Sequence, residues 1–175
     1  MITLKDKTFV KYLSSEFIQY TVHRLANQIY EDYYDKNPLF IGVLNGSFIF
    51  LSDLIRKYPG YLNVDFVKLK SYEGLQSSGN VKTILDFPDL IDKDIIIVED
   101  IIDTGHTLKK LYKMINEHQV NSCKVVSLFF KPDAFSEDLS INYIGKNIPD
   151  KFIVGYGLDY DGLGRNLNDV YQLKK

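Results

Sequence analysis

An uninterrupted apolar run that ends in acids constrains the fold of this chain more than any other segment. Four β-branched residues, Ile95 to Val98, follow one another and lead directly into Glu99 and Asp100. A strand with one solvated face alternates apolar and polar residues, whereas consecutive apolar residues indicate a strand covered on both faces. The segment from Asp94 to Glu99 is therefore predicted to be a central strand of a parallel sheet in an α/β fold.

Helical and strand-like patterns alternate along the rest of the chain, as is typical of a parallel sheet wrapped by helices. Residues 14–33 carry apolar side chains at helical spacing behind Ser14 or Ser15, either of which can cap the helix. Two further helices are predicted over 48–58 and 107–116, and the other strands over 39–44, 62–72, 81–86, 125–130 and 152–156. Ligands of such sheets bind outside the carboxyl ends of the strands, where Glu99 and Asp100 are expected.

Composition indicates one globular domain over residues 1–175 and argues against several function classes. A 45% hydrophobic chain of this length can bury a single sizeable core. Its net charge of −2 gives no basic surplus for nucleic acid or a membrane surface. The single cysteine, Cys123, allows no disulfide within the chain and favours a reducing compartment. Because no run approaches the roughly 20 apolar residues of a membrane span, we expect a cytoplasmic protein.

The acids at the end of the central strand indicate a sugar-phosphate ligand. Two adjacent buried carboxylates, Glu99 and Asp100, repel each other unless they find partners. A cis-diol can donate two hydrogen bonds to them, and Mg²⁺ can bridge them to hydroxyl or phosphate oxygens. The residues from Thr104 to Thr107 then offer hydroxyls and backbone N–H groups at a helix start, where phosphate binds well. This order predicts a ribose 5-phosphate lying across the loop, with Gly105 allowing its close approach.

The segment from Val98 to Thr107 resembles the phosphoribosyl-pyrophosphate motif of type I phosphoribosyltransferases. The acids Glu99, Asp100 and Asp103 in this setting are similar to those of the hypoxanthine-guanine group of that family. The resemblance implies a central, mostly parallel five-stranded sheet flanked by helices, with a small hood and a mobile flap loop. It also implies purine salvage: Mg²⁺-dependent transfer of the phosphoribosyl group from phosphoribosyl pyrophosphate to hypoxanthine or guanine. The products would be IMP or GMP and pyrophosphate, and the assembly a homodimer or homotetramer.

Several residues acquire roles in pyrophosphate binding from this resemblance. Leu44, Asn45 and Gly46 match the family's first pyrophosphate-contacting loop, in which a non-proline cis peptide bond would join Leu44 to Asn45. Arg165 would grip the same group, because a guanidinium fork suits two phosphate oxygens. The family usually has basic residues where this chain has Asn45 and His106, so these departures predict a weaker positive field around pyrophosphate.

The resemblance also assigns the reaction and the sugar phosphate. Asp103 would act as general base toward purine N7, and with Thr104, Gly105, His106 and Thr107 it would bind the 5′-phosphate. Ser71 and Tyr72 would belong to the flap that excludes water from the reacting centre.

Four residues would recognise the base. Lys131 would donate to the purine 6-oxo group, although a solvated lysine before the Pro132-Asp133 turn fits its spacing too. Phe152 would stack on the purine, Ile153 would contribute backbone groups, and Asp159 would lie beside the base and bind Mg²⁺ together with Glu99 and Asp100. A core aromatic is the alternative for Phe152.

Three other functions remain open at the level of sequence. Another type I phosphoribosyltransferase would act on adenine, xanthine or a pyrimidine. A non-catalytic regulator with the same fold would bind the nucleotide without converting it. A receiver-like phosphoacceptor also pairs acids with a strand end, but there the paired acids lie near the N-terminus rather than in mid-chain.

Overall fold

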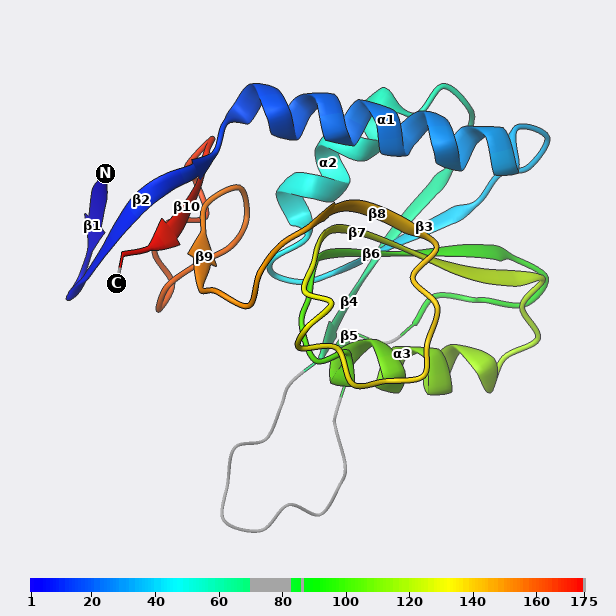
Figure 1. Cartoon of the computed structure of the whole chain (residues 1–175). Helices are drawn as coiled ribbons and strands as arrows, with labels where there is room; N and C mark the ends of the chain where they lie inside the picture. Colours follow the sequence, from blue (N-terminus) through cyan, green and yellow to red (C-terminus); the bar gives the residue numbers. More distant parts are fainter. Residues whose placement is uncertain (70–82, 86, 175) are drawn as a thin grey trace, which may run out of the picture.

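Six strands form the central sheet of the computed structural model, which describes residues 1–69, 83–85 and 87–174 (Figure 1). Five are parallel, in the order β4 (Asn63–Leu69), β3 (Leu39–Val43), β6 (Asp94–Ile102), β7 (Ser122–Phe130) and β8 (Tyr143–Asn147). The short strand β5 (Thr83–Leu85) pairs antiparallel with β4 at the edge. The expected α/β class and five-stranded parallel sheet are therefore confirmed.

Helices cover both faces of this sheet. Helices α1 (Ser15–Tyr33) and α2 (Phe48–Lys57) lie on one face, and α3 (His106–Asn116) lies on the other (Figure 1). The amphipathic pattern of residues 14–33 predicted α1 correctly, and the Ser14 hydroxyl accepts a hydrogen bond from the Phe17 N–H as its N-cap.

The central strand β6 contributes to a core on each side of the sheet. Ile96 and Val98 pack into the cluster beneath α1 and α2, whereas Ile95 and Ile97 pack into the cluster beneath α3. Successive side chains of a strand point to opposite faces, so four consecutive apolar residues require apolar partners on both. All four are at most 1% exposed, as the sequence pattern predicted.

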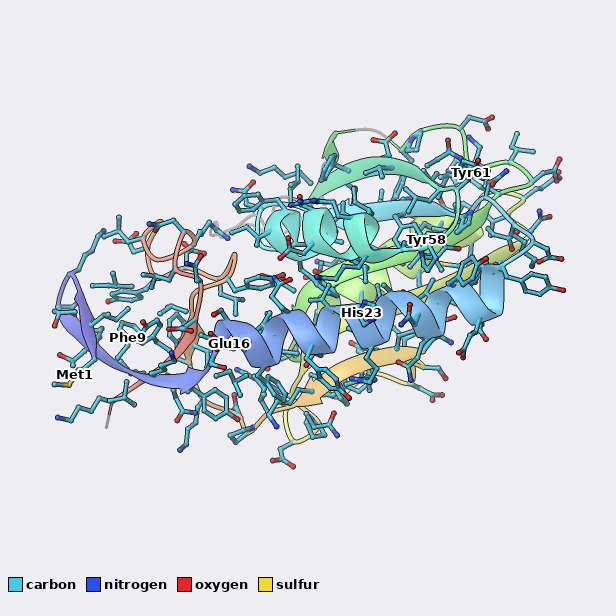
Figure 2. The ribbon with its side chains drawn as sticks, turned by 90° about the horizontal axis from the view of Figure 1, so that it is seen from above. Met1, Phe9, Glu16, His23, Tyr58 and Tyr61 are labelled. Carbon is cyan, nitrogen blue, oxygen red and sulfur yellow. The ribbon has the colours of Figure 1, made fainter. Side chains whose placement is uncertain are left out.

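A second, four-stranded antiparallel sheet forms a hood at one end of the molecule. It consists of β1 (Ile2–Leu4), β2 (Lys7–Leu13), β10 (Val170–Leu173) and β9 (Ile153–Val154), in that order. Both chain ends lie in this hood (Figure 1), and Phe9 is buried within it, at the opposite end of the molecule from Tyr61 (Figure 2).

The structure corrects the sequence prediction at one strand and adds four others: three in the hood and β8 in the parallel sheet. The segment 152–156 was expected to join the parallel sheet, but only Ile153–Val154 form a strand, and they pair with β10 in the hood. The last parallel strand is β8, whose mixed sequence YIGKN carries no buried-strand pattern. Among the described residues, no helix combines the length and hydropathy that crossing a bilayer requires.

Candidate active site

A cavity of about 380 Å³ opens at the carboxyl ends of the parallel strands. Its walls come from four places: the loop after β3, the end of β4, the end of β6 with the start of α3, and the hood. The sequence-predicted residues that line it are Leu44, Gly46, Glu99, Asp100, Asp103, Thr104, Gly105, His106, Thr107, Asp159 and Arg165. The parallel sheet and the hood thus bring together residues up to about 120 positions apart in the chain.

Two buried carboxylates dominate the electrostatics of this cavity. Glu99 and Asp100 are 7% and 8% exposed, at the end of β6. Burial raises the pKa of Glu99 well above its ordinary value, and the neighbouring Asp100 charge raises it further. Burial likewise raises the pKa of Asp100 to about 6, although backbone hydrogen bonds and the Arg165 charge act against it. Ionisation of the two acids is therefore unfavourable in the described part of the chain, and a cationic or hydrogen-bond-donating ligand would stabilise their charged forms.

Two glycines allow the loops around these acids to approach closely. A Cβ at Gly46 would overlap the Asp100 carboxylate, and a Cβ at Gly157 would overlap the Gly46 carbonyl oxygen. Gly157 has φ of +98°, which a residue with a side chain rarely adopts. The hood, the loop after β3 and the acid pair are thus in direct contact. The expected cis peptide bond joins Leu44 to Asn45 in that loop.

The start of α3 faces the cavity with its backbone donors uncapped. Gly105 is the N-cap with φ of +88°, and no side chain of the described residues accepts from the first turn of the helix. The first turn contains no acidic residue that would oppose an anion. Thr104 and Thr107 line the cavity on either side of Gly105. This arrangement suits a phosphate group, because N–H groups and the helix dipole both favour negative charge there.

Arg165 and Asp159 form an ion pair on the hood side of the cavity. Arg165 Nη2 lies 2.6 Å from Asp159 Oδ1, and Arg165 Nη1 donates to the Gly157 carbonyl at 2.6 Å. The other Asp159 oxygen accepts from the Gly162 N–H at 2.7 Å. Since both side chains are held by neighbouring residues, the hood presents a fixed guanidinium and carboxylate to the cavity.

Basic residues stand near both positions where the sequence departs from the family pattern. Asn45 is exposed, and its Oδ1 accepts from Lys68 Nζ, at the end of β4, at 3.0 Å. His106 is also exposed, and Lys110, one turn further along α3, lines the cavity. The sequence prediction missed both lysines. Helical spacing from His106 indicates Lys110, whereas the Lys68 contact needs the pairing of β3 with β4.

Lys131 is buried at the end of β7 and makes two ion pairs. Only 7% of the residue is exposed, so the solvated alternative is wrong. Its Nζ donates to Asp103 Oδ2 at 2.8 Å and to Asp150 Oδ1 at 2.9 Å. Burial lowers the pKa of Lys131, but these two bonds outweigh it and raise the pKa above its ordinary value. Asp150 was given no role from sequence, because nothing in its spacing indicates the contact.

Of the four residues assigned to the base, only Asp159 lines the cavity; Lys131, Phe152 and Ile153 lie outside its wall. Phe152 is 46% exposed and packs at the hood surface against Phe9 and Tyr160, with ring centroids 6.3 and 5.9 Å away. It is not a core aromatic. Ile153 is buried in β9. Ser71 and Tyr72, with the rest of the expected flap, lie outside the described residues.

Comparison with known proteins places this architecture in a family. Residues 12–161 match the phosphoribosyl transferase domain. A hypoxanthine-guanine phosphoribosyltransferase of Staphylococcus aureus is 42% identical over 164 residues, which cover 93% of this chain and 92% of the relative. The enzyme of the same name from Staphylococcus epidermidis is 41% identical over the same shares.

Solved structures show the same fold. A hypoxanthine-guanine phosphoribosyltransferase from Bacillus anthracis superposes with a TM-score of 0.89 at 36% identity, covering 97% of this chain and 99% of that one. A hypoxanthine phosphoribosyltransferase from Trypanosoma cruzi gives a TM-score of 0.88 at 34% identity, covering 99% and 95%. The likeness extends over the hood as well as the central sheet.

Proposed function

The chain belongs to the phosphoribosyl transferase domain family, and from that premise we propose that it transfers the phosphoribosyl group of phosphoribosyl pyrophosphate to a 6-oxopurine. Hypoxanthine or guanine would give IMP or GMP and pyrophosphate, a purine-salvage reaction. One observation carries the proposal: the buried acids Glu99 and Asp100 meet the uncapped start of α3 in one cavity. A ribose 5-phosphate satisfies both features at once.

The sugar phosphate and the leaving group bind at opposite sides of the cavity in this proposal. Ribose hydroxyls donate to Glu99 and Asp100, and the 5′-phosphate accepts from the N–H groups of residues 104–107. Pyrophosphate lies against the Leu44–Gly46 loop, where Arg165 offers its guanidinium. The direct contact of Gly46 with Asp100 and Gly157 supports this division, because it brings the acids, the loop and the hood to one point.

The carboxylates of the cavity fit a bound Mg²⁺. Glu99 and Asp100 would hold one ion and Asp159 a second, and their charge would offset that of the departing pyrophosphate. Oxygen ligands are the donors that Mg²⁺ prefers, and a cation would offset the cost of ionising the two buried acids, whose pKa values burial raises. In the described part of the chain no three His, Cys, Asp or Glu side chains form a ready-made metal cage. That agrees with Mg²⁺ binding through one or two carboxylates and substrate oxygens.

Asp103 and Lys131 act on the base. Asp103 accepts the proton of purine N7 while pyrophosphate leaves C1 of the ribose. Lys131 donates to the 6-oxo group, and its ammonium has no acceptor for the amino group of adenine. Phe152 offers an exposed ring on which the purine can stack, next to Ile153. The Lys131–Asp103 ion pair supports the assignment, since it places base recognition and proton transfer 2.8 Å apart.

A base panel tests the proposed function. The chain is incubated with phosphoribosyl pyrophosphate, Mg²⁺ and hypoxanthine, guanine, xanthine or adenine, and nucleotide formation is followed spectrophotometrically. Turnover of hypoxanthine or guanine, its loss in EDTA and its return with added Mg²⁺ are expected. Binding of phosphoribosyl pyrophosphate without transfer to any base would instead identify a nucleotide-sensing regulator.

We also propose self-association through the outer surface of α2 and β4. Phe48, Val64 and Phe66 are large apolar residues that remain 36–43% exposed there, and Tyr61 is 87% exposed. Neighbouring exposed apolar residues mark an interaction surface more often than isolated ones do. Light scattering should give a dimer or tetramer mass, and a charged residue at Phe66 should shift it toward the monomer.

A further inference from the structure

Lys131 Nζ stands between two carboxylates that come from different parts of the chain. Asp103 follows β6 and Asp150 precedes β9, and Lys131 donates to them at 2.8 and 2.9 Å. The lysine side chain is 8% exposed, whereas the Asp103 and Asp150 side chains are 47% and 62% exposed. An ammonium has three donors, so one N–H remains for a ligand while both pairs persist.

Backbone hydrogen bonds fix both carboxylates relative to the lysine. The Lys131 N–H donates to the Ile102 carbonyl at 3.0 Å, just before Asp103. The Ile148 N–H donates to the Phe130 carbonyl at 2.8 Å, two residues before Asp150. The three side chains therefore meet because neighbouring backbone segments are joined, and not through a chance surface contact.

We infer that Asp150 is a positioning residue for base recognition. It holds the Lys131 ammonium so that one N–H points to the purine 6-oxo group, while Asp103 accepts the proton of purine N7. This inference rests on the proposed function. Asp150 itself does not act on the reacting atoms.

The charge balance during proton transfer explains why a second carboxylate is needed. When Asp103 accepts the N7 proton, it becomes neutral and no longer balances the charge of Lys131. A buried ammonium without a counter-charge is costly. Asp150 keeps its charge through the step, so Lys131 remains paired and in place. Without Asp150, protonation of Asp103 would leave the Lys131 ammonium with neither of its two carboxylate partners charged.

A double-mutant cycle with two ligands tests the inference. Asp150→Asn, Lys131→Met and the combined variant are compared, and Asp133→Asn serves as a matched control because Asp133 is an exposed aspartate two residues after Lys131. Calorimetry measures the Kd of IMP and of ribose 5-phosphate, which lacks the base. Steady-state kinetics measures kcat and the KM of hypoxanthine and phosphoribosyl pyrophosphate.

Asp150→Asn should raise the Kd of IMP about tenfold or more, because a network of charge-assisted hydrogen bonds loses one member. The KM of hypoxanthine should rise with it, whereas ribose 5-phosphate and phosphoribosyl pyrophosphate should bind as before. Asp133→Asn should change none of these values. In the Lys131→Met background the Asp150 substitution should have no further effect on IMP, since the two residues act as a unit.

The outcomes separate this inference from the proposed function. If the unaltered chain converts no oxopurine, the proposed function is overturned and the inference with it. If it does convert them, equal weakening of IMP and ribose 5-phosphate by Asp150→Asn overturns the inference alone, because that result indicates general loss of structure. Additive effects of the two substitutions overturn it as well.

Discussion

At the scale of single residues, Gly46 matters because it has no side chain. It lies in the loop after β3, directly against the Asp100 carboxylate, and Gly157 of the hood packs on its carbonyl oxygen. The protein places three separate segments within contact here, and only a hydrogen fits between the loop and the acid. The position of Asp100 therefore depends on a residue that has no side chain of its own.

Gly46→Ala should reduce kcat/KM strongly while changing stability little. The added methyl group must push the Asp100 carboxylate from its place, and a displacement of about 1 Å in a catalytic site costs on the order of 10²-fold in rate. Steady-state kinetics and thermal melting measure the two effects. Ser140→Ala, at an exposed position outside the cavity, is the control and should leave both unchanged. A normal kcat/KM in Gly46→Ala would mean that catalysis does not depend on the exact position of the Asp100 carboxylate.

At the scale of elements, a small polar network fastens the hood to the helices. Asp53 of α2 accepts from Tyr156 Oη at 2.6 Å and from Gln19 Nε2 of α1 at 2.5 Å, through the same carboxylate oxygen. Tyr156 is 5% exposed and directly precedes Gly157. Burial and the Asp53 hydrogen bond both raise the pKa of Tyr156, so it stays protonated and donates at all ordinary pH values.

Tyr156→Phe should lower the free energy of unfolding by about 1–2 kcal/mol, since the ring still packs but the part-buried Asp53 carboxylate oxygen loses a donor. Tyr160→Phe is the matched control, because Tyr160 donates to Asp6 at 2.8 Å in an exposed pair. Its effect should stay below about 0.5 kcal/mol. Urea denaturation at neutral pH measures both. Equal effects of the two substitutions would contradict a fastening role for the Asp53 network.

The elements also differ in how far the sequence predicts them. Strands β3 and β6 and helix α1 were predicted closely, because consecutive apolar residues and helical spacing report burial directly. The hood was not located, since its short strands are held by pairing between the two ends of the chain. Strand β8 was missed for a similar reason: its place follows from parallel pairing with β7.

The residues of the candidate site also differ in how far the sequence predicts them. The acids and the phosphate-binding turn lie in one continuous segment, so their chemistry can be inferred from their order. The contacts of Lys131 with Asp103 and Asp150, and of Asn45 with Lys68, join residues 19 to 28 positions apart. They depend on which strands become neighbours, and local pattern does not contain that information.

At the scale of the whole molecule, the two acids required by the proposed function lower the stability of the ligand-free protein as pH rises. Folding buries Glu99 and Asp100, and both pKa values rise: that of Asp100 to about 6, and that of Glu99 well above its ordinary value. The folded chain then binds more protons than the unfolded chain between their ordinary pKa values and the raised ones. The contribution of these two groups to the free energy of unfolding is therefore largest at acidic pH, and it decreases as pH rises through their raised pKa values.

Asp100→Asn should accordingly stabilise the ligand-free protein at pH 7.5, by on the order of 2 kcal/mol, because the variant avoids burying that charge. At pH 4 the gain should disappear, since the unaltered carboxyl group is then protonated in the folded state. Thermal melting in EDTA at the two pH values measures the difference. A gain that is the same at both values would point to packing rather than charge.

Substrate should reverse the order of stability. With phosphoribosyl pyrophosphate and Mg²⁺ at pH 7.5, the Asp100 carboxylate of the unaltered chain gains partners, and ligand binding raises its melting temperature by mass action. Asp100→Asn should gain much less, so the unaltered chain becomes the more stable of the two. This crossover distinguishes a carboxylate that binds substrate from one that only stabilises the fold. If Asp100 only stabilised the fold, Asp100→Asn would destabilise the protein with or without substrate.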